Sequence, residues 1–199
     1  MFDSGIKVSD LIDQINLETD IALDIPDESY VLWLNSLQQL LYTEIIKEQK
    51  KTTLKPPFEN NLIDVSKLAE TGENAPCFED IHAVYADDTQ LIKSTVASGV
   101  IFHNTYFKIT DKLGFNATVD KEITIIYFVK PAMINPTDIG ESTVMIPIEF
   151  VDIAKAKLRG EAYKVANEDN LAAKWLNDYN ILLETFKAWV LDKSATFGL

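Results

Sequence analysis

The sequence predicts an α+β fold in which helices from both ends of the chain form a bundle and a β-rich lobe is inserted between them. Apolar residues recur every three or four positions near both ends, a spacing typical of amphipathic helices. From residue 78 to 131 the spacing changes to two, as in strands. We therefore expect a helical bundle domain from 1-55 and 146-195, a lobe at 78-131, connecting segments at 56-77 and 132-145, and a C-terminal tail at 196-199.

Two helices are expected before the lobe. The first covers residues 8–16 and has four apolar side chains on one face: Val8, Leu11, Ile12 and Ile15. The second begins after Pro26, with Asp27 as its cap, and we expect it to continue to Lys51, because lysines suit the carbonyl end of a helix. A further short helix is expected within residues 61–70.

The lobe is expected to contain several strands. Residues 81–86 and 90–96 suggest a hairpin that turns at Asp87-Asp88, because aspartate tolerates turn geometry. Residues 105–110 suggest a strand followed by a turn at 111–114. A last strand, within 121–131, carries apolar residues on both faces, so both of its sides are expected to be partly covered.

A helical hairpin is expected after the lobe. Pro147 favours the start of its first helix, and the segment 167–170 separates it from the second. Alanines in the stripe of the first helix allow a neighbouring helix to approach closely. The residues expected to pack in the core or between subunits are Val151, Ala154, Leu158, Ala162, Trp175, Tyr179 and Trp189.

Composition narrows the class of protein. The single cysteine, Cys77, excludes a disulfide framework and a CxxC metal site. A net charge of −13 argues against a surface that grips nucleic acid. No apolar run is as long as the roughly 18 to 20 residues that a membrane span requires, and the first residues do not resemble a signal peptide. We expect synthesis in the cytosol and no membrane partner.

The negative charge is concentrated in residues 1–28, which contain eight acids against the one base Lys7. Three interpretations stay open. The acids form a solvated face, or they meet a basic partner, or they line a passage through which DNA slides without sticking.

The sequence contains no recognisable catalytic or metal-binding pattern. His82 and His103 lack the spacing that places two imidazoles on one metal ion. Acidic neighbours would raise the pKa of the Cys77 thiol, which does not favour a nucleophile. Asp80 lies near the Asp87-Asp88 turn, but a turn explains that pair better than a cation site. We therefore predict no catalytic residue, metal or cofactor.

The order of these elements resembles that of the head–tail connector proteins of tailed bacteriophages, the adaptor or head-completion class that includes tail tubular protein A-like proteins. The resemblance rests on the opening DLIDQINLETDIALDIPDESYVLWLNSLQQLLYTEI, on the β-rich insertion, on IPIEFVDIAKAKLRGEAYKVANEDN and on LAAKWLNDYNILLETF. It covers nearly the whole chain as a pattern of elements and contains no diagnostic motif.

The resemblance implies a structural virion protein of the neck. Such a protein forms a homomeric ring, commonly a dodecamer, that docks on the portal protein, extends the DNA channel and offers a platform to the next neck or tail protein. It also implies that the C-terminal end faces the portal, through Thr196, Phe197, Gly198 and Leu199. The alternative is an enzyme or small-ligand binding protein with a cleft between helices and lobe, where Asp80, His82 and His103 would act.

Overall fold

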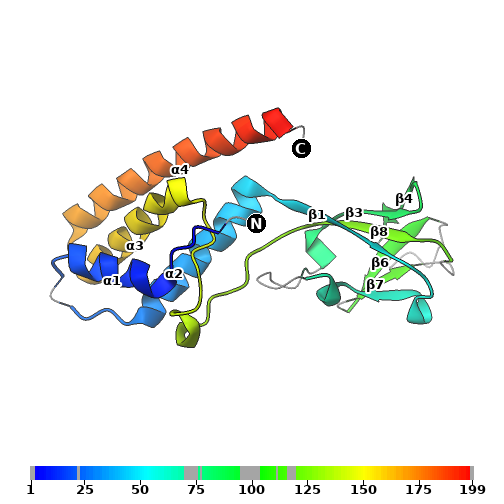
Figure 1. Ribbon diagram of the computed structural model, residues 1–199, viewed down its shortest axis with the longest axis horizontal. Helices are drawn as coiled ribbons and strands as arrows, with labels where there is room; N and C mark the ends of the chain where they lie inside the picture. Colours follow the sequence, from blue (N-terminus) through cyan, green and yellow to red (C-terminus); the bar gives the residue numbers. More distant parts are fainter. Residues whose placement is uncertain are drawn as a thin grey trace. The chain divides into compact units, whose positions relative to one another are not determined.

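The structure, a computed structural model of the chain, describes residues 3–21, 23–69, 76, 78–94, 104–110, 112–115 and 120–197. It has two compact units, each with its own core (Figure 1). Unit 1 consists of Met1–Ile46 and Met133–Leu199, and unit 2 of Lys47–Ala132. Helices near both termini flank a β-rich region, which confirms the predicted α+β class.

Unit 1 is built from α1 (Val8–Glu18), α2 (Asp27–Leu40), α3 (Val151–Val165) and α4 (Asp169–Phe197). A π-helical turn, Leu41–Ile46, extends α2. Helix α3 contacts each of the other three helices (Figure 1). It is therefore buried on almost every side, at Val151, Ile153, Ala154, Ala156, Leu158, Gly160, Ala162 and Tyr163.

Two buried polar side chains of α2 hold the segment that returns from unit 2. The amide of Asn35 donates to the carbonyl of Ile134 at 3.0 Å and accepts from its N–H at 2.8 Å. One turn later, Gln38 accepts from the N–H of Met145 at 2.6 Å. These bonds satisfy backbone groups that no regular element pairs, so α2 acts as the template for the segment.

Unit 2 contains two four-stranded sheets. The first has the order β1 (Gln49–Leu54), β8 (Ile123–Phe128), β3 (Ile81–Ala86) and β4 (Thr89–Gln90). The second has the order β2 (Leu62–Asp64), β7 (Lys112–Phe115), β6 (Thr105–Ile109) and β5 (Ile92–Lys93). Both sheets contribute to one core, which includes Ile63, Val84, Leu113, Ile123 and Ile125.

The prediction that the second helix continues to Lys51 is wrong. Helix α2 and its π turn end at Ile46, and Lys47 has a φ of 49°, which no α-helix continues. Residues from Gln49 onward form β1, which pairs antiparallel with β8. The change of unit falls at Lys47, before the boundary expected at residue 55. Each residue of β1 pairs with a residue of β8 that lies 69 to 79 positions further along the chain, so local periodicity could not reveal the strand.

Four smaller expectations also need correction. Residues 112–115 form β7 instead of a turn, since β7 pairs with both β2 and β6. The short helix expected within 61–70 is replaced by β2 and a 3-10 turn at Val65–Leu68. The hairpin strand after the aspartates is only two residues long, and β5 pairs parallel with β6 in the other sheet. Finally, α4 extends through Thr196 and Phe197, where we expected a tail.

Candidate functional site

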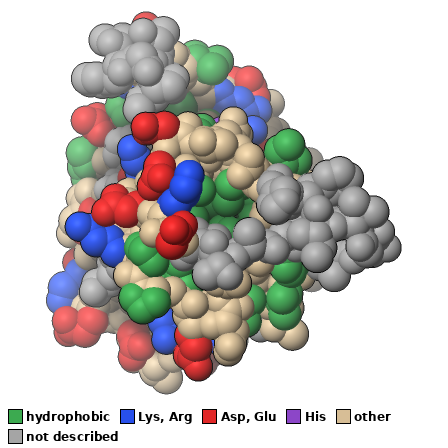
Figure 2. All heavy atoms as spheres, turned by 90° about the vertical axis from the view of Figure 1, so that its right-hand side faces the viewer, with side chains coloured by type: hydrophobic (Ala, Val, Ile, Leu, Met, Phe, Trp, Pro, Cys, Tyr) green, Lys and Arg blue, Asp and Glu red, His purple; other side chains and the backbone are tan. Residues whose placement is uncertain are grey.

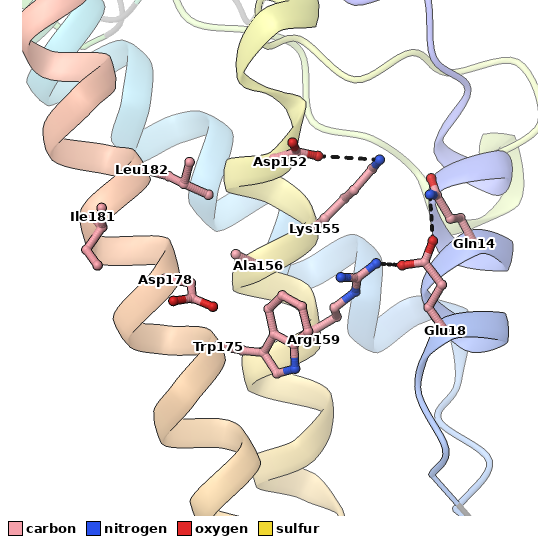
Figure 3. Close-up of a pocket in the computed structure, with 10 residues that line it drawn as sticks. All are labelled: Gln14, Glu18, Asp152, Lys155, Ala156, Arg159, Trp175, Asp178, Ile181 and Leu182. Carbon is pink, nitrogen blue, oxygen red and sulfur yellow. Dashed lines mark hydrogen bonds and ion pairs between the residues drawn. The ribbon is translucent and has the colours of Figure 1, made fainter.

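A hollow in unit 1 lies across α3, between α1 and α4, and has a volume of about 470 Å³ (Figure 3). We call it the inter-helix groove. Helix α1 forms one wall, α4 the other, and α3 the floor (Figure 3). Its lining residues are Gln14, Glu18, Asp152, Lys155, Ala156, Arg159, Trp175, Asp178, Ile181 and Leu182.

Arg159 is the central polar group of the groove. Its guanidinium forms an ion pair with Glu18 of α1 and lies 4.6 Å from the ring centre of Trp175 on α4 (Figure 3). Gln14 donates to the same carboxylate at 2.7 Å. Of these interactions, the contact with Trp175 is the better shielded from water, because the Arg159 side chain is only 12% exposed whereas that of Glu18 is 42% exposed. Together they connect all three helices.

Burial also affects the electrostatics of Arg159. It lowers the pKa of the guanidinium from its ordinary value, and the neighbouring Tyr163 acts in the opposite direction. The group stays cationic at physiological pH, because an arginine pKa begins far above it. Its Nε is buried and has no hydrogen-bond partner among the residues that the structure describes. Arg159 is thus held between Glu18 and Trp175 on the floor of the groove.

The remaining lining residues leave one acid uncompensated. Lys155 pairs with Asp152 at 3.4 Å. No hydrogen bond or ion pair joins the Asp178 carboxylate to another described residue, and it points from α4 toward α3 (Figure 3). Ile181, 58% exposed, and the half-buried Leu182 add apolar surface. The groove therefore combines apolar side chains with a free carboxylate, an arrangement suited to recognition.

The residues predicted to pack lie in two settings. The α3 residues Val151, Ala154, Leu158 and Ala162 belong to the core of unit 1. On α4, Trp175 lines the groove and Tyr179 lies beneath Lys157, whose Nζ is 5.4 Å from the ring centre. Trp189 stacks near Phe186 and Phe150, with ring centres 5.9 and 5.2 Å away. The predicted portal-facing residues fall at the end of α4: the side chains of Thr196 and Phe197, and all of Gly198 and Leu199, lie outside the described residues.

The residues considered for chemistry are not assembled into a site in the described part of the chain. Asp80 is buried and forms an ion pair with Lys130. His82 is exposed, with its ring edge-on to Phe128 at 5.4 Å. His103 and Cys77 lie outside the described residues. Among the described residues, no cluster of three or more His, Cys, Asp or Glu side chains has the arrangement of a metal site.

The acidic turn of the lobe is confirmed. Asp87 and Asp88 form the turn between β3 and β4, and Asp87 has a φ of 50°, which aspartate tolerates better than most residues. The Asp87 carboxylate accepts from the N–H of Glu122 at 3.3 Å and lies 3.6 Å from Nζ of Lys121. These contacts explain the aspartates as structural.

A second hollow, of about 420 Å³, lies in unit 2 near β2 and β7 and includes Lys67 and Lys112 in its lining. The positive charges of both lysines act on the Asp64 carboxyl. Hydrogen bonds from the Ser66 hydroxyl and N–H, followed by the charges of these lysines, lower the pKa of the Asp64 carboxyl. Acidic and basic side chains alternate over the visible face in Figure 2, with apolar ones between them. The hollow itself is close to charge-balanced, because its lining has the bases Lys55, Lys67 and Lys112 against the acids Glu59 and Asp64.

One residue type in the sequence points to the groove. Arg159 is the only arginine of the chain, which otherwise uses lysine as its base. Arginine stacks on aromatic rings and forms directed ion pairs better than lysine does. A lone arginine in a helix is thus a reason to expect such a contact, but its partners Glu18 and Trp175 come from helices far apart in sequence.

Comparison with known proteins assigns no family. No protein-family model matches the chain, and no curated protein matches it significantly. Within the described ranges, none of the helices combines the length and apolar character that crossing a membrane requires.

Proposed function

We propose that the chain is a structural virion protein, a head-to-tail adaptor of a tailed bacteriophage. In this role, copies form a homomeric ring, commonly a dodecamer, that docks on the portal protein and extends the DNA channel. The ring gives the next neck or tail protein a platform, and DNA passes through it without specific binding. The protein is then located in the virion, at the interface of head and tail.

The observation that carries the proposal is that large apolar side chains are exposed on both units, although each unit has its own core. Unit 1 exposes Leu17 by 88% and Leu191 by 71%, and unit 2 exposes Ile92 by 69%. A ring subunit needs such contacts in several directions, because it meets two neighbours, the portal and the tail at once. The order of elements shared with connector proteins supports the same role.

The distribution of charge supports the channel part of the proposal. All eight acids of residues 1–28 are exposed, including Asp20, Asp24, Asp27 and Glu28 around the α1–α2 loop. An acidic wall repels DNA phosphates, so it lets the genome pass without binding it. The alternative of an enzyme or ligand-binding protein has no comparable support, since Asp80 is engaged by Lys130 and His82 is exposed beside Phe128.

The direct test is to mix the purified full-length chain with portal particles and to image the mixture by electron microscopy. The proposal predicts extra ring-shaped density on the portal and co-migration of the two proteins. A chain that stays unbound, with no ring on any particle, would refute it. The double variant His82→Gln, His103→Gln is the control: a structural role predicts assembly like that of the wild type, whereas an enzymatic role predicts intact folding with lost infectivity.

A further inference from the structure

We infer that the inter-helix groove binds a basic amphipathic helix of a partner protein, with apolar side chains against Trp175, Ile181 and Leu182 and a lysine or arginine against Asp178. The inference goes beyond the ring proposal and does not depend on it, because every contact that supports it lies within unit 1. It specifies which surface of unit 1 binds a partner, and it specifies that the bound segment of the partner is basic and amphipathic.

The shape of the groove suits a helix. Its walls are two helices and its floor is a third, so it is elongated along α3 (Figure 3). Ala156 on the floor has a small side chain, which leaves depth between α1 and α4. A volume of about 470 Å³ holds several large side chains. Grooves of this kind bind one face of an amphipathic helix through residues spaced three and four apart.

The apolar surface of the groove is pre-arranged for binding. Trp175 is fixed by the Arg159 guanidinium on its ring, so its position requires no ordering when a partner arrives. Ile181, six residues further along α4, is 58% exposed. On α1, Leu17 does not line the groove but is 88% exposed next to the lining residue Glu18, where a bound helix could also cover it. Covering these side chains is favourable, and tryptophan and arginine are the residues most often found at binding hot spots.

Charge decides which helix fits. The groove has three acids and two bases, and both bases already pair with groove acids, Arg159 with Glu18 and Lys155 with Asp152. Asp178 is left uncompensated. Lys174 lies at the rim, with its Nζ 5.5 Å from the ring centre of Trp175, but unit 1 as a whole carries 8 bases and 19 acids, a net charge of −11. A basic helix is therefore attracted to the groove, whereas the helical unit of a second copy would bring the same sign of charge.

Two helical peptides test the inference on the full-length chain. The first is an amphipathic peptide of about 18 leucine and lysine residues, and the second replaces every lysine with glutamate. Binding is measured by fluorescence anisotropy of labelled peptide, and the indole N–H signals of the three tryptophans are followed by NMR. We expect the lysine peptide to bind at least roughly tenfold more tightly than the glutamate peptide. We expect the Trp175 signal to move most.

Variants then locate the binding surface. Asp178→Lys should weaken the lysine peptide by roughly tenfold or more, and Ile181→Ser by about tenfold, because one removes the free charge and the other an apolar anchor. The matched control is Asp24→Lys, which makes the same change of charge at an exposed position of the α1–α2 loop and should weaken binding by less than about threefold. Circular dichroism and the unfolding midpoint establish that each variant is folded.

Several results would overturn the inference. Equal losses of peptide affinity in Asp178→Lys and Asp24→Lys would mean that the lysine peptide is attracted to the acidic protein in general and not to the groove. Failure of the lysine peptide to bind the folded wild type would mean that the groove is no helix site. If the chain instead self-associated, and Ile181→Ser abolished this, the groove would hold a second copy. Loss of ring assembly on the portal, by contrast, would affect the adaptor proposal and leave peptide binding unchanged.

Discussion

Helices α3 and α4 are consecutive in the chain and form one hairpin, yet they have different roles. Helix α3 is buried at eight of its 15 residues. Helix α4 has 29 residues, and among those whose side chains are described only Ala172, Phe186 and Val190 are buried. The comparison shows that regular apolar spacing alone does not reveal how a helix is used, since both helices have it.

The neighbours of each helix explain the difference. Helix α3 contacts α1, α2 and α4, so it needs small side chains on several sides, and at Gly160 an added Cβ would lie 2.7 Å from Leu176 of α4. Helix α4 packs along α3 and reaches the π turn with its C-terminal half, which leaves its other flank facing the groove or solvent. We conclude that α3 mainly stabilises the fold of unit 1, whereas α4 has exposed surface that a partner can bind.

The largest expected effect is a difference in protein stability between matched variants of the two helices. Leu158→Ala on α3 removes a side chain that is 0% exposed and should lower the free energy of unfolding by about 3 kcal/mol. The matched change on α4, Leu191→Ala, removes a side chain that is 71% exposed and should cost less than about 0.5 kcal/mol. Urea unfolding of both variants measures the difference. Similar losses of unfolding free energy in the two variants would contradict the different roles of α3 and α4.

A smaller effect tests the closeness of the two helices. Gly160→Ala should destabilise the protein by about 1–2 kcal/mol, because the clash with Leu176 outweighs the higher helix propensity of alanine. Gly140→Ala is the control, since an added Cβ there meets nothing within 4 Å. Thermal unfolding compares the two variants. A more stable Gly160→Ala protein would mean that α4 shifts away from α3 at little cost.

A third prediction concerns the contact that joins α3, α4 and α1. Arg159→Lys keeps the charge but loses the planar group that lies on Trp175 and pairs with Glu18. We expect the free energy of unfolding to fall by about 1 kcal/mol. We also expect a change in the environment of Trp175, detected by its indole NMR signal. Lys187→Arg, twelve residues further along α4 in an exposed ion pair with Glu184, is the control for a change between the two bases. An unchanged Trp175 signal in Arg159→Lys would contradict the described contact.

The smallest expected effect is a pH dependence within α3. Burial would raise the pKa of the Glu161 carboxyl, but hydrogen bonds and charges from Lys157, and then from Lys164, outweigh it and lower the pKa. The resulting stabilisation is fully present above the ordinary value of 4.5 and is lost as pH falls through the lowered folded-state value.

Glu161→Gln should therefore reduce stability near neutral pH and flatten its decline below about pH 4.5. Urea unfolding at several pH values measures both effects. Glu184→Gln on α4 is the control, because its ion pair with Lys187 is exposed and contributes little. A steeper decline of stability at acid pH in Glu161→Gln than in the wild type would contradict a lowered pKa of the Glu161 carboxyl.

The sequence was informative where structure is set by local spacing. The apolar stripe of Val8 to Ile15 and the alternation of Ile123 to Tyr127 predict their elements correctly, since each element buries one or both of its own faces. It was misleading where a distant partner decides. Gln49–Leu54 is lysine-rich and follows a helix, but its backbone pairs with β8, so it is a strand.

The groove was also beyond local reasoning. The sequence places Trp175 on an apolar stripe and gives Arg159 no apparent partner, whereas the fold brings the two together with Glu18 from the first helix. Only the packing of three helices determines that Asp178 remains unpaired. Stripe residues of α3 could be predicted as packing residues, but the free flank of α4 could not, because its exposure depends on what α1 and α3 leave uncovered.

The most direct test of the division between α3 and α4 is hydrogen exchange of the full-length chain, alone and bound to the lysine peptide. We predict that amides of residues 151–165 exchange slowly in both states, because α3 is already buried. Amides of residues 171–182 and 14–18 should gain protection only when the peptide is bound. Fast exchange in α3 of the free chain, or protection that appears elsewhere while α4 stays unchanged, would contradict the account.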